Sequence, residues 1–319
     1  MGSGKFVISL DFELHWGAAE RWDLKLKKEY FDTTRRSIPF VLSLFEKYNI
    51  HATWATVGFL FAKNKQQLLD FCPKERPTYK NNELSYYKII DSDEVGNDEN
   101  EDPYHFAPSL IELILKTPNQ EIGTHTFAHY YCNESGQTKN QFNADLKAVQ
   151  AIAKENFGIE LKSLVFPRNQ FNFEYIEVAK KNGIKVVRSN PDVWFWKSKS
   201  KLARLARAFD TLMPISRTLT FKLKKSYGDE VLMLPASRFF RPFTRKEKNI
   251  QVMKMNRIKK EMTFAAKNKC VYHLWWHPHN LGESLDENLF YLEMILKHYR
   301  GLNEKYGFSS ASMLEMSNK

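Results

Sequence analysis

The sequence predicts an α/β protein built as a parallel β/α barrel of about seven strands. Two observations favour this class. Short apolar runs recur along the chain between amphipathic helical patterns, and this alternation is typical of parallel β/α units. Several of these runs end at a glycine or a polar residue, at the position where such barrels gather their functional groups. The 319 residues are long enough for one such domain, so we expect residues 1–319 to form a single barrel.

Seven apolar runs are the expected strands, and four amphipathic patterns between them are the expected helices. The strands are residues 5–10, 51–57, 121–123, 163–166, 184–188, 231–234 and 270–276. The helices are residues 33–48, 143–156, 174–182 and 286–299, and Gly183 follows the third as a C-cap. We expect these helices to pack around the strands.

Two further segments do not fit a minimal barrel, and we expect insertions near 63–118 and 193–230. The first contains an acidic run, residues 91–102, that partly matches the spacing of a calcium loop. Val95 occupies a ligand position of that loop, and Asp102 stands where the bidentate glutamate is required. These mismatches favour a solvated loop over a calcium site.

The second insertion contains a strongly basic stretch, residues 197–225, with nine Lys or Arg against one Asp. Apolar residues recur there at helix-like spacing, at Leu202, Leu205, Phe209 and Leu212. Such a stretch can be a lid packed on the barrel, or it can lie on an anionic membrane surface. The pattern alone leaves both interpretations open.

The composition limits the compartment and the partners. A net charge of +11 and a pI near 9.3 attract anionic partners such as nucleic acid, anionic lipid or phosphorylated sugars. No nucleic-acid-binding motif accompanies the charge, so a specific nucleic acid is not expected. Three scattered cysteines indicate free thiols, and no apolar leader precedes the first strand. We expect a cytoplasmic protein, with the basic stretch offering contact with the inner membrane face.

Four residues have the pattern of a catalytic metal site. Asp11 and Glu13 lie two apart at the end of the first strand, so they share one face. His125 and His129 are four apart, and on a helical turn they would lie on one side. Two imidazoles and one carboxylate are the ligand set of an open catalytic zinc site, with a water in the remaining position. The alternatives are two packed histidines and, for Asp11, a cap at the strand end.

In this order the motifs resemble those of the polysaccharide deacetylases, carbohydrate esterases that remove N- or O-acyl groups from sugars on a distorted β/α barrel. The resemblance spans Phe6 to about Gly282. His125-Thr-Phe-Ala-His129 is similar to the metal motif of that family. Its usual opening, Thr-Phe-Asp-Asp-Gly, is replaced by Ser9-Leu-Asp-Phe-Glu13. The resemblance implies that Asp11 is the base and that Glu13 supplies the carboxylate ligand, because Phe12 takes the ligand position.

The resemblance also implies three supporting residues. Arg168, in Phe-Pro-Arg, is the expected partner of Asp11, and Asp192 is expected to orient the acid. The acid itself is His277, in Trp-Trp-His-Pro-His. We favour it over His279 because it directly follows a strand, and a general acid must be held on a rigid element.

The implied reaction is metal-dependent hydrolysis of an acyl group, acetyl above all, with Zn²⁺ as the expected ion. A cytoplasmic, basic enzyme of this kind suits nucleotide-linked or lipid-linked sugar precursors, whose phosphates Arg and Lys can bind. Two alternatives remain: a non-catalytic glycan-binding protein on the same barrel, favoured by Phe12, and a membrane-surface protein, favoured by the basic stretch 197–225.

Overall fold

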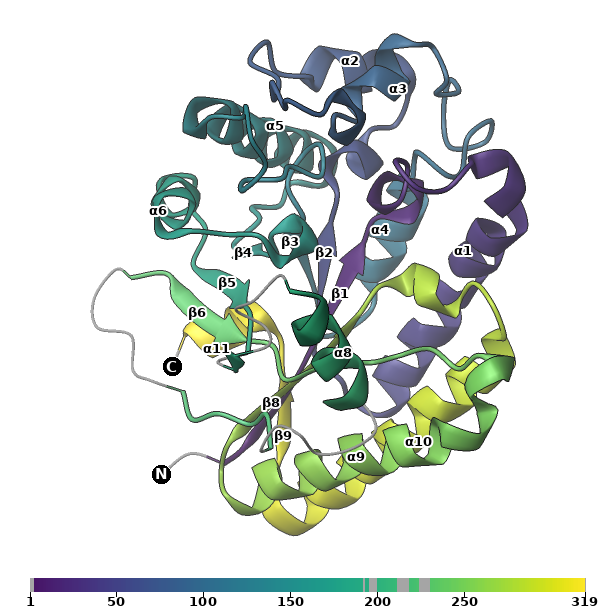
Figure 1. The fold of residues 1–319 in the computed structure, drawn as a ribbon, viewed down its shortest axis with the longest axis vertical. Coiled ribbons are helices and arrows are strands. Elements are labelled where there is room, and N and C mark those ends of the chain that lie inside the picture. The colour runs from purple at the N-terminus through teal and green to yellow at the C-terminus, as the bar shows by residue number, and fades with distance from the viewer. Residues whose placement is uncertain (1–2, 192, 195–199, 211–217, 224–229, 319) are drawn as a thin grey trace.

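The computed structural model describes the chain except residues 1–2, 192, 195–199, 211–217, 224–229 and 319 (Figure 1). Its centre is a nine-stranded sheet in the order β6-β5-β4-β3-β2-β1-β8-β7, with β9 also paired to β1. Every strand pair in the sheet is parallel. The strands are β1 (Lys5–Phe12), β2 (Ala52–Thr56), β3 (Gln120–Thr124), β4 (Ser163–Leu164), β5 (Val186–Ser189), β6 (Leu232–Pro235), β7 (Arg238–Phe239), β8 (Val271–Trp276) and β9 (Ser309–Ala311).

The predicted fold class is confirmed, because the parallel sheet curls into a barrel-like form with helices around it. β1 pairs with β8 along one edge and shares its other edge between β9 and β2. The two residues between β6 and β7 connect the two ends of the curved sheet. The Ala236 N–H donates to Ser189 O of β5, and the Ser237 N–H donates to His273 O of β8, each at 2.8 Å. All seven expected strands are present. β7 and β9, with two and three residues, are too short to appear as apolar runs.

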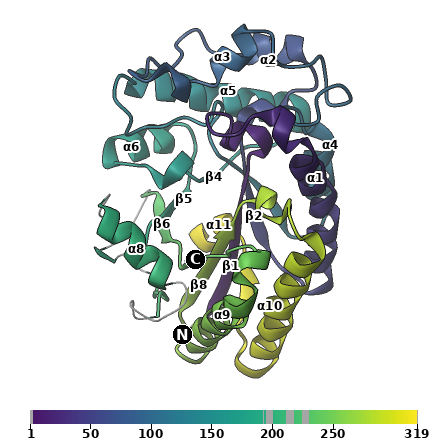
Figure 2. The ribbon, with the colours of Figure 1, turned by 45° about the vertical axis from the view of Figure 1, so that its right-hand side comes forward.

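Ten α-helices and several 3₁₀ turns connect the strands within the described residues. The helices are α1 (Leu24–Lys47), α2 (Lys65–Phe71), α3 (Tyr87–Asp91), α4 (Pro108–Lys116), α5 (Lys139–Phe157), α6 (Phe173–Lys181), α8 (Lys201–Asp210), α9 (Lys248–Lys267), α10 (Leu285–Tyr306) and α11 (Met313–Ser317). The four predicted helices correspond to α1, α5, α6 and α10. Figure 2 shows α9 and α10 side by side along the sheet, with α1 next to α10.

Helix α9 was not predicted, because its buried face is not purely apolar. Gln251, Lys254 and Glu261 are all buried on it, and these polar residues interrupt the apolar period. Glu261 receives two hydrogen bonds from Arg238, at 2.7 and 2.8 Å, so its charge is balanced inside the protein. The sequence pattern of such a helix resembles that of a solvated segment.

The two insertions differ from their expectations in different ways. The acidic run 91–102 is not simply a solvated loop, because Val95 and Asp102 are buried. Asp102 accepts a hydrogen bond from the Gly96 N–H at 3.0 Å and from the His105 imidazole at 2.7 Å. The second insertion contains α8, and much of the predicted basic stretch lies outside the described residues. No helix in the described part of the chain is long and apolar enough to cross a membrane.

Candidate active site

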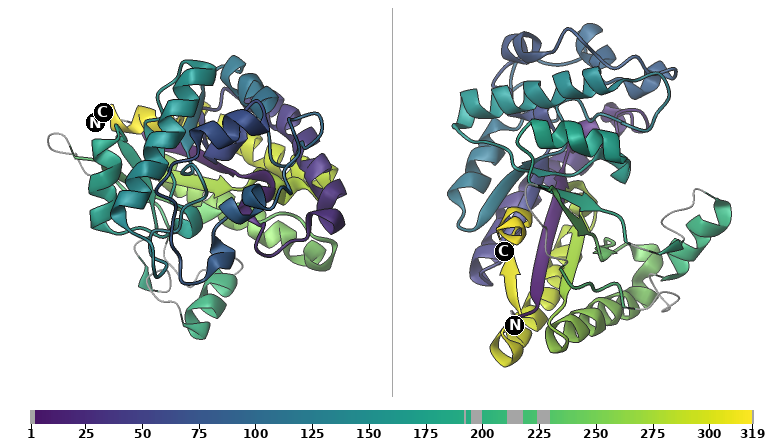
Figure 3. Two further views of the ribbon diagram at one scale, coloured as in Figure 1. Left: turned by 90° about the horizontal axis from the view of Figure 1, so that it is seen from above. Right: turned by 90° about the vertical axis from the view of Figure 1, so that its left-hand side faces the viewer.

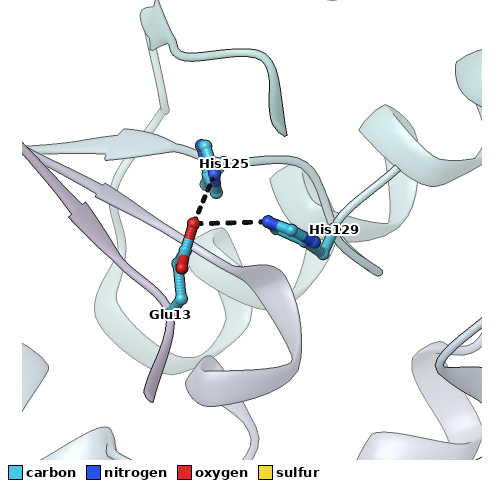
Figure 4. A group of neighbouring side chains, drawn as sticks. All are labelled: Glu13, His125 and His129. Atoms are coloured by element: carbon cyan, nitrogen blue, oxygen red, sulfur yellow. Dashed lines mark hydrogen bonds and ion pairs between the residues drawn. The ribbon is translucent and has the colours of Figure 1, made fainter. Parts of the chain in front are cut away.

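Glu13, His125 and His129 meet at the carboxyl end of the sheet (Figure 4). Glu13 directly follows β1, and His125 directly follows β3. The Oε1 atom of Glu13 lies 2.9 Å from His125 Nε2 and 3.3 Å from His129 Nε2. All three side chains are buried, so the structure brings the predicted ligand set together away from bulk water.

The segment from His125 to His129 is not the helical turn that the spacing suggested. Its backbone is irregular, with a left-handed φ of 67° at Thr126 and 53° at His129. Asp145, from α5, fixes this loop by accepting the Phe127 and Ala128 N–H groups at 2.7 and 3.0 Å. Burial raises the pKa of Asp145 to about 7, although both hydrogen bonds oppose that shift. The two imidazoles converge because the loop folds back on itself, not because of helical periodicity.

Glu13 has a position that only a glycine neighbour permits. It stands at the start of a 3₁₀ turn, η1 (Leu14–Gly17), and its side chain folds back over Gly17. A Cβ atom at Gly17 would lie 2.7 Å from the Glu13 Cβ and would collide with the carboxylate. Burial opposes ionisation of Glu13, but the surrounding imidazoles outweigh it and hold the pKa of Glu13 well below its usual range. The carboxylate is therefore charged.

The proton positions on His125 favour a cation at this site. His125 Nδ1 lies 2.8 Å from the carbonyl oxygen of Val165, which can only accept, so Nδ1 carries the proton. His125 Nε2 faces the charged Glu13 oxygen at 2.9 Å and has no hydrogen-bond partner. Burial also lowers the pKa of His129, which favours its neutral form. The nitrogens of two imidazoles and the oxygen of one carboxylate converge there, and this set fits a divalent metal ion such as zinc.

Asp11 is held by Arg188, not by Arg168 as the sequence had suggested. Arg188 Nη1 and Nη2 donate to Asp11 Oδ1 and Oδ2, each at 2.6 Å, in a bidentate pair between buried groups. Burial raises the pKa of Asp11, but the Arg188 charge outweighs it, so the pKa lies below its usual value. The Arg188 guanidinium also lies 4.3 Å from the centre of the Trp275 ring.

A chain of buried hydrogen bonds positions Arg188 in turn. Arg188 Nη1 donates to Ser9 Oγ at 3.1 Å, and Ser9 Oγ lies 2.8 Å from His273 Nε2. His273 Nδ1 lies 3.2 Å from Pro235 O, which only accepts. Because Arg188 can only donate and Pro235 O can only accept, the direction of every hydrogen bond in the chain is fixed. His273 Nδ1–H donates to Pro235 O, and the Ser9 hydroxyl donates to His273 Nε2. Burial lowers the pKa of His273 to about 3, in agreement with a neutral ring.

Arg168 instead lines the cavity. It forms an ion pair with Glu20 and lies 4.2 Å from the centre of the Tyr131 ring. Arg168 and Asn169 both have left-handed backbones, with φ of 53° and 52°. This tight turn sends the Asn169 amide toward Arg188, which donates to its Oδ1 at 3.0 Å. The expected contact between Arg168 and Asp11 is therefore not formed. The arginine that contacts Asp11 lies on the next strand, β5, whereas Arg168 follows β4.

Two histidines follow β8, and their surroundings differ. His277 Nε2 faces the cavity, 3.7 Å from Asp11 Oδ2 and 3.8 Å from Glu13 Oε1. Its Nδ1 lies 3.2 Å from Asn280 Oδ1, which orients the ring. His279 is buried, and burial lowers its pKa to about 3, so it is a poor proton donor. Asp192, the expected orienting group, lies outside the described residues.

These groups share a cavity of about 300 Å³. It is lined by Asp11, Glu13, His129 and His277, by Arg168, and by the rings of Trp22 and Trp275. The sequence-based reasoning missed Arg188, Asn169, Gly17 and Trp22. Of these, only Arg188 carried a usable signal, because it stands at the end of a predicted strand, as catalytic barrel residues do.

The comparisons with known proteins agree with this arrangement. The family model for polysaccharide deacetylase matches residues 30–187, about half of the chain, including both histidines of the cluster. No curated protein matches the chain. Among solved structures, a Mycobacterium smegmatis protein assigned as a polysaccharide deacetylase covers 99% of this chain and 90% of its own, at 11% identity and a TM-score of 0.60.

Two other solved structures share the fold at similarly low identity. A Pseudomonas aeruginosa PAO1 protein assigned to the same class covers 98% of this chain and 89% of its own, at 9% identity and a TM-score of 0.59. A GH57-type branching enzyme from Pyrococcus horikoshii covers 99% and 70%, at 11% identity and a TM-score of 0.54. The solved structures show the shared fold, and the match to the family model shows that the chain belongs to the polysaccharide deacetylase family.

Proposed function

We propose that the protein is a metal-dependent hydrolase that removes an N- or O-acyl group, most simply acetyl, from a sugar. The observation that carries this proposal is the convergence of Glu13, His125 and His129 beside an Asp11–Arg188 pair in one cavity. A divalent cation there would balance the buried Glu13 carboxylate and would give His125 Nε2, which has no hydrogen-bond partner, a ligand bond.

The donor set suits Zn²⁺, since two histidines and one carboxylate leave coordination positions for water and substrate. A divalent ion held there supplies a water of lowered pKa, about 7, and polarises the acyl carbonyl. The residues of the chain supply the remaining functions: proton transfer, orientation and exclusion of bulk water.

Asp11 is the general base in this mechanism. Its carboxylate is ionised and fixed by Arg188, so it can accept the proton of the attacking water. His277 is the general acid, because its Nε2 faces the same cavity and its Nδ1 contacts Asn280. It gives a proton to the departing nitrogen or oxygen of the sugar. No covalent enzyme intermediate is required.

The cavity also bears on the substrate. About 300 Å³ is at the small end of ligand pockets and suits one sugar residue with its acyl group. Trp22 and Trp275 offer rings for stacking on a sugar, and Arg168 and Arg21 bring cations to the lining. Both arginines also pair with Glu20, and together they could bind the phosphate of a nucleotide-linked or lipid-linked precursor in glycan biosynthesis.

The proposal is tested by metal content and acetate release measured on the same preparations. The wild-type protein should contain about one zinc ion per chain and release acetate from one or more acetylated nucleotide sugars or lipid-linked sugars. Glu13→Ala should lose metal affinity, whereas Asp11→Asn should keep the metal and lose turnover. Tight binding of acylated glycans without acetate release from any of them would instead support a non-catalytic glycan-binding protein.

A further inference from the structure

The outer side of α9 combines lysines with exposed apolar side chains. The exposed positions of this helix recur every three or four residues and form one stripe along it. The stripe consists of Lys248, Asn249, Val252, Met253, Asn256, Lys260, Phe264 and Lys267. The exposed fractions of its apolar members, Val252, Met253 and Phe264, are 61%, 47% and 42%. Large apolar side chains at such exposure, spaced between lysines on one face, suit a boundary between water and an apolar phase.

The charge on this stripe is uniformly positive. The carboxylate within α9, Glu261, is buried against Arg238, at 2.7 Å, and points away from the stripe. Glu247, just before the helix, is 2.6 Å from the buried Lys254. Glu261 is thus paired inside the protein, and the partly exposed Glu247 precedes the helix and is paired with Lys254, which leaves lysines as the exposed charges of the stripe.

Helix α8 extends the same character beside α9. Its Asp210 is 3.9 Å from Arg257 of α9 and 3.4 Å from Arg238, so the end of α8 is tied to α9 by ion pairs. Leu202 and Leu205 of α8 are 68% and 57% exposed. The right-hand view of Figure 3 shows both helices on the same side of the molecule. The exposed Lys201, Leu202 and Leu205 therefore continue the character of α9 into the segment that the sequence predicts to be basic and amphipathic.

We propose that the α8–α9 surface binds the protein peripherally to an anionic lipid membrane. Anionic headgroups attract lysines over about 8–10 Å at physiological salt, and apolar side chains then enter the interface. Nucleic acid fits less well, because its binding surfaces rely on arginine and on aromatic stacking, whereas the α9 stripe offers lysines and a single aromatic ring, Phe264. The inference is independent of the proposed deacylation, since it rests on the outer helices and not on the cavity.

Vesicle co-sedimentation tests the charge requirement. The wild-type protein should bind phosphatidylcholine vesicles that contain phosphatidylserine, should bind pure phosphatidylcholine far more weakly, and should dissociate as salt is raised. Lys260→Glu/Lys267→Glu should reduce the partition coefficient by about 10-fold or more. The matched control is Lys180→Glu/Lys181→Glu, which changes the net charge equally on exposed positions of α6 and its end. It should bind nearly as well as the wild type.

A second pair of variants tests the apolar requirement. Phe264→Ser should weaken binding to the same vesicles, whereas Phe173→Ser, at an 83% exposed position on α6, should not. All these positions are exposed, and equal unfolding temperatures will show that each variant is folded. Three results would overturn the proposal: no binding to phosphatidylserine vesicles, equal losses in the stripe and control variants, or tighter binding to a short RNA or DNA oligonucleotide than to vesicles.

Discussion

The two sides of the cavity are built differently. The side that carries Glu13, His125 and His129 is almost closed to solvent, with each of these residues 1–3% exposed. Its groups are fixed by backbone contacts, as in the loop held by Asp145. The opposite side carries His277, whose side chain is 23% exposed and whose Nδ1 contacts a single amide, Asn280. The first side is closed and preorganised, whereas the second presents a partly exposed imidazole to the cavity.

This difference has a chemical reason. A metal ion needs its ligands within a few tenths of an ångström, so the ligand side must be rigid before the ion binds. A general acid must be within hydrogen-bond reach of the leaving group in the cavity, so partial exposure of a ring held on a rigid element is compatible with its role. Substitutions on the two sides should therefore fail in different ways: loss of metal on one side, and loss of proton transfer on the other.

The largest effect is expected on the ligand side. His125→Ala or His129→Ala should remove the metal and lower activity by at least about 1,000-fold, because the ion supplies several kcal/mol of transition-state stabilisation. His51→Ala is the matched control, since His51 pairs with Glu315 at 2.8 Å on the surface. Metal analysis of the purified variants checks this directly. Normal zinc content in a His125→Ala/His129→Ala double variant would contradict the ligand assignment.

On the acid side, the effect should depend on the leaving group. His277→Ala should slow amide cleavage by about 100- to 10,000-fold and leave metal content unchanged, because general acid catalysis is lost. An activated ester, which needs little protonation on departure, should lose much less. His279→Ala should affect both substrates alike, since this ring is buried and neutral. Parallel rates on the two substrates separate these cases, and equal losses for His277→Ala would exclude it as the acid.

The sequence predicted the strands and their ends well, because parallel strands are continuous apolar runs and barrel sites lie at their carboxyl ends. By this logic Asp11, Glu13, His125 and His277 were expected at one end of the sheet, and the structure brings them together there. The loop from His125 to His129 could not be predicted, since left-handed φ values at Thr126 and His129 leave no trace in residue type. Similarly, the sequence could not show that Arg188, and not Arg168, contacts Asp11. That contact depends on which strand faces Asp11 across the barrel, and the spacing of residues along the chain does not encode it.

The third prediction separates the two arginines. Arg188→Met leaves the buried Asp11 carboxylate unpaired, which should lower the free energy of unfolding by about 3–5 kcal/mol and remove most turnover. Arg168→Met should cost far less stability, because Arg168 is partly exposed and Glu20 keeps its hydrogen bond from Tyr86. Denaturant unfolding and kinetics on the same samples test this. If Arg168→Met is the more damaging to both, the guanidinium beside Asp11 has been misassigned.

The smallest effect concerns the buried chain behind Arg188 and appears as a pH dependence of stability. The pKa of His273 is about 3 in the folded protein, whereas an unfolded histidine has a value of about 6.5. Between these values the unfolded chain binds a proton that the folded protein excludes, so stability falls as pH falls. For this one group, the loss from about pH 7 to about pH 5 is about 2 kcal/mol.

His273→Gln should remove the part of the loss of stability at low pH that comes from protonation of His273. The glutamine side-chain oxygen can still accept a hydrogen bond from the Ser9 hydroxyl. The variant should therefore be less stable than the wild type at about pH 7, but the gap should narrow by about 2 kcal/mol at about pH 5. Unfolding by urea at the two pH values measures both quantities. The metal should be removed first with a chelator, so that protonation of His125 and His129 does not add metal loss to the comparison. If the difference in unfolding free energy between the variant and the wild type does not change with pH, His273 binds a proton as readily in the folded protein as in the unfolded chain. The hydrogen-bond directions assigned from Pro235 to Asp11 would then be wrong.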